Sequence, residues 1–325
     1  MKTYISPGDF IDSYYRLKNH GVSFFLKRAG ISNSKRIKGA WNSVTARSDL
    51  HWWDIPAVRE RWNILATGNP RLEPNEYFFE RYFPDGGNLN LLSPGCGTGD
   101  KEIALAGFWQ VGSIDAFDIA EKRIEVAVRK AAEKNIKKIR FFVADISRYD
   151  FGKEKYDIII FDSFLHHVKE VEEMLSKCRA ALKKDGFLII NEYVGPNRFQ
   201  WSAAQLNAAN KLLSALPAHL KRRASGKVKG KIYRPGILRM ILSDPSEAVN
   251  SEAILPGLEK YFSPVEVHPY GGNILQLLLK DIERNFVDLT DEEKTELDKI
   301  FDAEDEFINK GKSDFLFGIY KPKQS

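Results

Sequence analysis

A glycine-rich segment followed by two well-spaced acids is the part of the sequence best suited to bind a ligand. Residues 93–100 have the sequence SPGCGTGD, Asp118 follows 19 residues after Gly99, and Asp145 ends a later apolar run. Glycines at alternate positions permit a sharp strand-to-helix turn and remove Cβ atoms that would block a ligand lying against the backbone. An acid about 20 residues beyond such a loop binds ribose hydroxyls. The spacing predicts a site for a nucleoside-type cofactor.

The neighbours of these acids complete the predicted nucleoside site. Asp145 is suited to accept a hydrogen bond from the exocyclic amine of adenine, and Ile119 and Ile146, each following an acid, would enclose the purine ring. The alternative for any single aspartate at a strand end is a cap on the following helix. The glycine loop, Asp118 and Asp145 occur together in the order of a cofactor site, which favours that interpretation over three separate helix caps.

The spacing of the glycines separates two classes of nucleoside cofactor. A dinucleotide site has the pattern G-x-G-x-x-G, which would require its third glycine at position 100. This chain has Asp100 there and Gly99 before it, so the pattern from Gly95 is G-x-G-x-G. A helix N-terminus that carries an acid is poorly suited to the pyrophosphate of a dinucleotide. The loop therefore argues against NAD.

The elements that must position these residues follow from the spacing of the apolar side chains. From residue 88 onward, short apolar runs alternate with amphipathic stretches, which indicates a parallel sheet with helices on both faces. Residues 197–262 are predicted to be a mostly helical insertion, and strands at 265–270 and 314–320 favour an antiparallel edge. Aromatic residues at helical spacing in residues 1–85 predict a helical leader that packs as a lid on the rest.

Taken together, these features resemble the class I S-adenosylmethionine-dependent methyltransferases. The resemblance rests on the loop 95–99, on Asp118 and Asp145 with their isoleucines, on YDIIIFDSFLHHV at 156–168 and on LKKDG at 182–186. It implies an α/β, Rossmann-like fold over residues 86–325: a seven-stranded, mostly parallel sheet with an antiparallel C-terminal edge strand. It also implies S-adenosylmethionine as cofactor. The residues that would contact the cofactor are Ser93, Gly95, Cys96, Gly97, Gly99, Asp118, Ile119, Asp145, Ile146, Asp162 and Ser163.

One position departs from the family pattern. The family usually has an acid two residues before the first loop glycine, where this chain has Ser93. That acid orients the methionine end of the cofactor, so Asp100 or Glu102 would have to replace it. Beyond the core, residues 191–201, 233–235 and 244–248 resemble one uncharacterised bacterial branch of the family, whose members often accompany surface-glycan assembly enzymes.

The predicted catalytic residues lie beyond the fourth and fifth strands. Methyl transfer is an in-line displacement, accelerated mainly by positioning, and a hydroxyl acceptor benefits from a general base as well. His166 and His167 follow the strand whose end faces the methyl group in this fold, and Glu192 ends the next strand. The alternative is that one histidine packs and the other faces solvent. No metal site is predicted, because no third ligand follows the pair at helical spacing.

The predicted acceptor pocket is formed by residues that follow the fifth strand. Tyr193, Arg198 and Trp201 lie where the ligands of open α/β sheets bind, although Trp201 is equally suited to a lid core. Arg234 is expected to hold an anionic group such as a phosphate or uronate, with a surface ion pair as the alternative.

Charge and composition limit the classes of partner that this chain can have. The net charge is +5, residues 1–48 hold nine lysines or arginines against two acids, and residues 221–234 are basic throughout. Solvated surfaces are the first explanation, and an RNA or an anionic membrane surface is the alternative. Two cysteines, Cys96 and Cys178, are too few for a disulfide framework and predict a cytoplasmic protein, and no apolar run is long enough for a membrane span.

These observations predict methyl transfer, by O-methylation, to a small-molecule or glycan acceptor. One alternative is an RNA methyltransferase acting on ribose or carbon, which the basic tracts suggest. Methylation of a base amine is disfavoured because residues 162–165 are DSFL instead of an Asn/Asp-Pro-Pro-aromatic tetrapeptide. The other alternative is a non-catalytic protein that binds S-adenosylmethionine, which Ser93 leaves open. The sequence identifies neither the acceptor nor the oligomeric state.

Overall fold

The computed structural model describes residues 2–10, 14, 37, 39, 41 and 50–324. Within these residues, seven strands form one sheet in the order β3-β2-β1-β4-β5-β7-β6. The strands are β1 (Leu89–Pro94), β2 (Val111–Asp118), β3 (Ile139–Val143), β4 (Tyr156–Asp162), β5 (Leu182–Tyr193), β6 (Phe262–Gly271) and β7 (Phe315–Pro322). Strands β1 to β5 pair in parallel, and β7 pairs antiparallel with both β5 and β6. The predicted fold class is confirmed.

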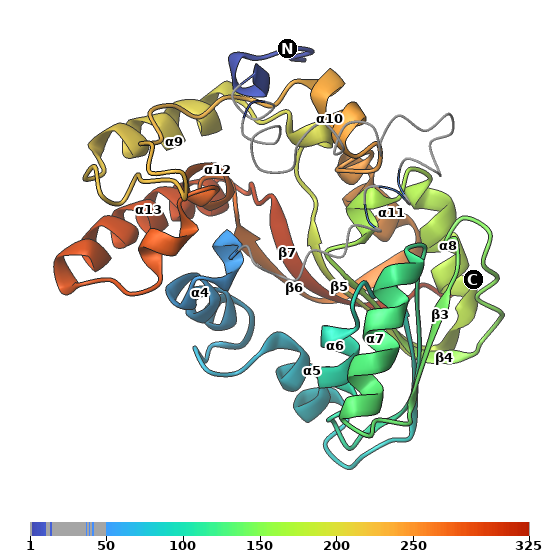
Figure 1. Ribbon diagram of the computed structural model, residues 1–325. Coiled ribbons are helices and arrows are strands. Elements are labelled where there is room, and N and C mark those ends of the chain that lie inside the picture. The colour runs from blue at the N-terminus through green and yellow to red at the C-terminus, as the bar shows by residue number, and fades with distance from the viewer. Residues whose placement is uncertain are drawn as a thin grey trace.

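Helices cover both faces of this sheet (Figure 1). The α-helices are α4 (Pro56–Thr67), α5 (Pro74–Tyr82), α6 (Asp100–Leu105), α7 (Glu121–Glu133), α8 (Val171–Ala181), α9 (Ala203–Ala215), α10 (Ile237–Ser243), α11 (Ile254–Tyr261), α12 (Leu275–Leu279) and α13 (Asp291–Asn309). Short 3-10 helices span Trp52–Asp54, Leu165–His167, Asn197–Phe199, Ser251–Ala253 and Glu283–Phe286. None of the helices in the described part of the chain is long and apolar enough to cross a membrane.

The strand sequences explain why both faces are covered. Along β4, Ile158 and Ile160 belong to one buried cluster, whereas Ile159 and Phe161 belong to another. The first cluster contains side chains of α4, α5 and α12, and the second contains side chains of α8 and α11. A continuous apolar run is the sequence expected for a parallel strand that is buried on both faces. The sheet therefore leaves only its edges and strand ends for ligands.

Two predicted elements differ in detail from those observed. The antiparallel strand β7 lies one position in from the edge of the sheet, which β6 occupies. Residues 197–262 are only partly helical, because residues 216–236 form an irregular segment between α9 and α10 that contains Pro217, Gly226 and Pro235. Proline and glycine disfavour helix interiors, so this stretch forms loops.

The predicted N-terminal leader is described only in part. Residues 2–10 lie against the segment that leads into α10, where the Thr3 carbonyl accepts a hydrogen bond from the Ile237 amide at 2.9 Å. Further along, Trp62 of α4 stacks on Tyr270 of β6 with ring centroids 4.5 Å apart. Apart from residues 37, 39 and 41, the basic stretch 16–47 lies outside the described residues, and so does the membrane or RNA contact suggested for it.

Candidate functional site: two adjoining cavities at the strand ends

A cavity of about 160 Å³ lies beyond the carboxyl ends of β1, β2, β3 and β4. The predicted cofactor residues that line it are Gly95, Asp118, Ile119, Asp145, Ile146 and Ser163. Phe117, Phe164, His167 and Arg123 also contribute to its wall. The sequence therefore predicted six of the lining residues as cofactor contacts, and each lies within three residues of the end of a parallel strand.

The glycine loop has the backbone conformation that its sequence suggested. Gly95, Gly97 and Gly99 have φ values of 74°, 55° and 76°, in the left-handed region that side chains disfavour. A Cβ atom at Gly99 would lie 2.7 Å from the Phe141 ring and 2.8 Å from the Cβ of Ala127. This glycine is required both by the turn and by the close approach of α7 and β3.

The two strand-end acids each use part of their hydrogen-bonding capacity within the protein. Asp118 accepts the Gly97 amide at 3.1 Å through Oδ2 and the Ala120 amide at 2.8 Å through Oδ1, so it ties the glycine loop to the end of β2. Asp145 accepts the amide and hydroxyl of Ser147 through Oδ1, at 3.0 and 2.7 Å. Its Oδ2 takes no hydrogen bond from the described residues and is available to a donor in the cavity.

Glu102 of α6 is paired with the residue that departs from the family pattern. The Ser93 hydroxyl donates to Glu102 Oε1 at 2.6 Å, while Oε2 is buried and has no hydrogen-bond partner among the described residues. Burial raises the pKa of the Glu102 carboxyl to about 7. By contrast, Asp100 is exposed and pairs with Lys130 at 2.8 Å. Glu102 lines neither cavity, but its carboxyl lies directly beside Ser93, so Glu102 suits the missing acid's position better than Asp100.

The remaining predicted cofactor residues lie beside the cavity and outside its lining: Ser93, Cys96, Gly97, Gly99 and Asp162. Asp162 Oδ1 forms an ion pair with Lys101. The Phe164 ring packs against Gly95, where a Cβ would approach it to 2.1 Å. Burial raises the pKa of the Cys96 thiol well above its ordinary value, which is unfavourable for a nucleophile.

The sequence prediction of a directly catalytic Glu192 does not fit its surroundings. Glu192 has no exposed surface, and its Oε1 lies 2.9 Å from Nδ1 of His166. Its Oε2 accepts the backbone amides of Phe164 and His166, at 3.1 and 3.2 Å. Three protein donors therefore surround this carboxylate, which fixes the orientation of the His166 ring instead of reaching an acceptor. Although burial opposes it, the negative charge of Glu192 raises the pKa of His166.

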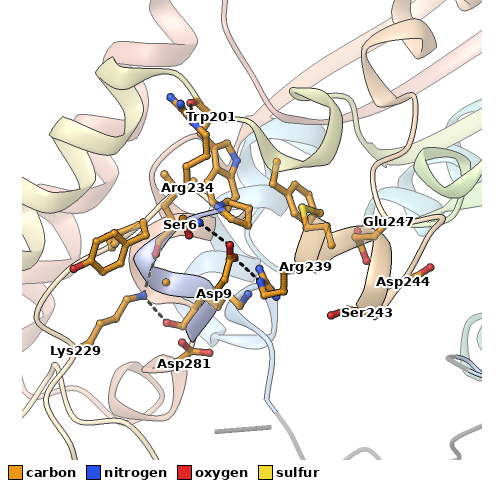
Figure 2. A pocket seen from close by; sticks show the side chains of 18 of the residues that line it. Ser6, Asp9, Trp201, Lys229, Arg234, Arg239, Ser243, Asp244, Glu247 and Asp281 are labelled. Atoms are coloured by element: carbon orange, nitrogen blue, oxygen red, sulfur yellow. Dashed lines mark hydrogen bonds and ion pairs between the residues drawn. The ribbon is translucent and has the colours of Figure 1, made fainter. Parts of the chain in front are cut away.

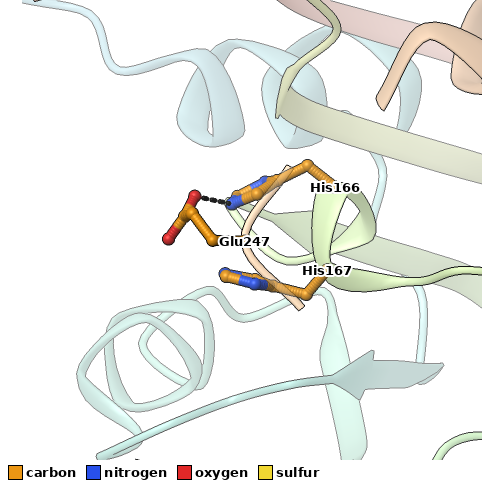
Figure 3. A group of neighbouring side chains, drawn as sticks. All are labelled: His166, His167 and Glu247. Carbon is orange, nitrogen blue, oxygen red and sulfur yellow. Dashed lines mark ion pairs between the residues drawn. The ribbon is translucent and has the colours of Figure 1, made fainter. Parts of the chain in front are cut away.

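A residue far along the chain joins the histidine pair (Figure 3). Glu247 Oε1 lies 3.6 Å from Nε2 of His166, and ligand atoms of His166, His167 and Glu247 all lie within 4.8 Å of one another. His167 Nδ1 lies 3.2 Å from the Ser246 hydroxyl. The sequence predicts no metal site because no third ligand follows the pair at helical spacing, whereas the fold brings the Glu247 carboxylate from the loop after α10 beside the two imidazoles.

A second cavity, of about 360 Å³, shares lining residues with the first, and Figure 2 shows residues that line this second cavity. Trp41 and Arg123 line both cavities, and the second also reaches Glu247 and residues 229–244. Cations outnumber acids in its lining: Arg123, Arg223, Lys229, Lys231, Arg234, Arg239 and Lys280 against Asp9, Asp244, Glu247 and Asp281. Its position and charge suit an acceptor that bears an anionic group.

The predicted acceptor residues divide into two groups. Trp201 and Arg234 line the second cavity, where Arg234 Nε donates to the Trp201 carbonyl at 2.7 Å. Tyr193 is buried and donates to the Pro196 carbonyl at 2.9 Å. Arg198 donates to the Glu247 carbonyl at 2.9 Å. A direct role in acceptor binding therefore does not fit Tyr193 and Arg198, whose polar groups are used to hold loops in place.

Lys229 is a lining residue that the sequence did not single out. Its ammonium donates to the carbonyls of Leu277, Leu278 and Lys280, at 3.0, 2.9 and 2.6 Å. Burial lowers its pKa to about 7. In the sequence it was one cation of a basic run, and no signal distinguished it from its exposed neighbours.

Comparisons with known proteins identify the family of the chain. The sequence model of a family described as "Methyltransferase domain" matches residues 85–259, more than half of the chain. A malonyl-[acyl-carrier protein] O-methyltransferase of Bacillus anthracis is 28% identical over 121 residues, 37% of this chain and 43% of that protein. A ubiquinone biosynthesis O-methyltransferase of Rickettsia bellii is 28% identical over 146 residues, 43% of this chain and 56% of that protein. The chain thus spans about half the length of these relatives.

A solved structure shows the same fold over nearly the whole chain. The geranyl diphosphate C-methyltransferase of Streptomyces coelicolor A3(2) covers 91% of this chain and 99% of its own, with a TM-score of 0.51 and 13% identity. The predicted family, fold and cofactor are confirmed by the family match together with this sheet order. The chain belongs to the class I S-adenosylmethionine-dependent methyltransferases.

Proposed function

We propose that the protein transfers the methyl group of S-adenosylmethionine to an oxygen atom of a small-molecule or glycan acceptor. The observation that supports this most directly is the pair of adjoining cavities, which share Trp41 and Arg123. The larger cavity has the size of ordinary small-molecule sites, roughly 300–1,000 Å³. A ligand held there would meet a cofactor held at the strand ends.

The residues of the smaller cavity fit the adenosine half of the cofactor. Asp118 would accept the ribose hydroxyls, and Asp145 Oδ2 would accept the exocyclic amine of adenine. Ile119 and Ile146 provide apolar contacts for the two faces of the purine. Glu102 is not part of that lining, but it lies beside Ser93 and its Oε2 has no hydrogen-bond partner among the described residues, so this oxygen would accept the methionine ammonium.

The reaction needs an acceptor oxygen in line with the methyl carbon. The O–C bond forms as the S–C bond breaks, and sulfur keeps the electron pair as S-adenosylhomocysteine. Positioning supplies most of the acceleration of such a displacement. His167 lines the smaller cavity and Glu247 the larger one, so either can hydrogen-bond an acceptor hydroxyl at the junction and take its proton as the O–C bond forms.

Other observations support the choice of an oxygen acceptor and the proposed location. Two relatives are named O-methyltransferases, although each matches only part of this chain. The lining cations favour an acceptor with a phosphate or carboxylate group over a neutral one. A cytoplasmic location is proposed because Cys96 and Cys178 are both free thiols.

Two measurements test the proposed function. Calorimetry should show binding of S-adenosylhomocysteine that Asp145→Asn weakens and Asp150→Asn does not, since Asp150 makes a similar turn outside the cavity. Incubation with radiolabelled S-adenosylmethionine and fractionated cell extract should then label a small-molecule or glycan fraction. Label found in RNA would show that the acceptor is RNA and overturn the proposed acceptor class. Tight binding of S-adenosylmethionine without transfer of label to any fraction would favour a non-catalytic protein.

A further inference from the structure

We propose that His166, His167 and Glu247 bind a divalent transition-metal ion at the junction of the two cavities. The proposal concerns a site that the sequence did not predict, because Glu247 follows α10 while the histidines follow β4. Figure 3 shows the two imidazole rings and the carboxylate grouped together.

The spacing of the ligand atoms is close to that of a metal site. Nε2 of His166 and Oε1 of Glu247 are 3.6 Å apart, and the three residues offer ligand atoms within 4.8 Å of one another. Metal–ligand bonds of about 2.0–2.2 Å require ligand atoms roughly 3–3.5 Å apart. His166 is buried, whereas His167 and Glu247 are partly exposed, so a shift of about 1 Å in those two side chains would close the set around an ion.

Hydrogen bonds already fix both imidazoles in the tautomer that a metal requires. The carboxylate of Glu192 can only accept, so His166 donates from Nδ1, and in the neutral imidazole the lone pair lies on Nε2, the nitrogen that faces Glu247. The Ser246 hydroxyl donates to Asp244 Oδ1 at 2.6 Å and therefore accepts from Nδ1 of His167, which frees that Nε2 as well. Metal-binding histidines characteristically donate their other ring N–H in this way.

The third ligand is held in place by its own loop. Arg198 donates to the backbone carbonyls of Pro245 and Glu247, at 2.6 and 2.9 Å, and thereby fixes the segment that contains Ser246 and Glu247. A folded protein that positions the ligands in advance loses little entropy when the ion binds.

The donor set indicates the kind of ion and its coordination. Two imidazoles and one carboxylate suit Zn²⁺ or a similar first-row ion, whereas Mg²⁺ prefers oxygen ligands. Three protein ligands leave a fourth position open, as in catalytic zinc sites. That position faces the junction, because His167 lines the smaller cavity and Glu247 the larger. If the proposed function holds, the ion would take the acceptor hydroxyl there and hold its oxygen beside the methyl group.

The test uses the full-length protein after treatment with a chelator. Equilibrium dialysis against Zn²⁺, with metal analysis, should give one ion per chain, and Co²⁺ should show the visible absorption bands of imidazole ligation. Glu247→Gln and His167→Gln should each weaken Zn²⁺ binding by about tenfold or more. His219→Gln is the matched control, because His219 forms an isolated pair with Glu293 at 2.6 Å. Thermal unfolding of each variant checks that it folds.

The outcomes separate this proposal from the proposed function. Wild-type protein without a stoichiometric ion, or variants that bind Zn²⁺ as well as the wild type, would overturn the metal site. Binding of S-adenosylhomocysteine is measured on the same samples. If the protein binds S-adenosylhomocysteine but does not bind Zn²⁺, only the metal proposal fails. If it binds Zn²⁺ but not S-adenosylhomocysteine, only the proposed function fails.

Discussion

Replacement of Glu102 by glutamine tests how this chain compensates for Ser93. The wild-type carboxyl is buried beside Ser93, and its pKa of about 7 compares with an ordinary value of 4.5. The folded protein therefore binds this proton more tightly than the unfolded chain does. The resulting cost to stability is small below about pH 4.5, grows as the pH rises, and is complete above about pH 7.

The difference in pKa corresponds to about 3 kcal/mol of unfolding free energy. Glutamine has nearly the shape of the protonated Glu102 side chain and cannot ionise. Raising the pH from 4.5 to 8 should therefore lower the unfolding free energy of Glu102→Gln less than that of the wild type. Urea unfolding at several pH values measures this difference. Asp100→Asn, on the exposed side of α6, should follow the wild-type profile.

Folding favours the protonated Glu102 carboxyl, whereas binding of the cofactor should favour the ionised form. A ligand ammonium favours the ionised carboxylate, so wild-type affinity for S-adenosylhomocysteine should rise as the pH increases towards 7 and then level off. Loss of a charged hydrogen bond of about 1.5–3 kcal/mol predicts roughly 10- to 100-fold weaker binding by Glu102→Gln at pH 8. 5′-Methylthioadenosine lacks the ammonium and should bind both proteins equally. Equal weakening of both ligands, or of neither, would refute the assignment of Glu102.

Three further substitutions test the packing around the site. Gly99→Ala should lower the unfolding free energy by about 2–4 kcal/mol, because the new Cβ would collide with Phe141. Gly226→Ala is the control and should cost about 1 kcal/mol, because a Cβ there has nothing within 4 Å. Equal losses of stability in urea unfolding would contradict this. Arg198→Ala should lower kcat/KM for the acceptor by a larger factor than it weakens S-adenosylhomocysteine binding, because the loop that it loosens carries Glu247 of the larger cavity and only Ser246 of the smaller one. The exposed Arg222→Ala serves as control, and equal losses in the two measurements would contradict this. Phe78→Ala should lower the unfolding free energy by about 3–5 kcal/mol in the same assay, because Phe78 is fully buried against Phe187. A decrease below about 1 kcal/mol would show that α5 is not part of the core.

The sequence by itself was sufficient for the fold and for half of the candidate site. Apolar runs buried on both faces specify parallel strands, and such strands end at one edge of the sheet. Asp118 and Asp145 each follow or end a strand, so their positions along the chain already placed them beside the same cavity. Backbone geometry links sequence position to location in these cases.

Only the tertiary structure decided which side chains face the cavities. Tyr193 ends β5 and Arg198 follows it at the expected edge, yet their polar groups bond to backbone carbonyls. Glu247 reaches His166 from a loop after α10, and no local periodicity encodes a contact between segments so far apart. Packing across the fold also gives Glu102 its place beside Ser93. Strand order fixes where a residue lies, whereas the direction of its side chain depends on neighbours from distant parts of the chain.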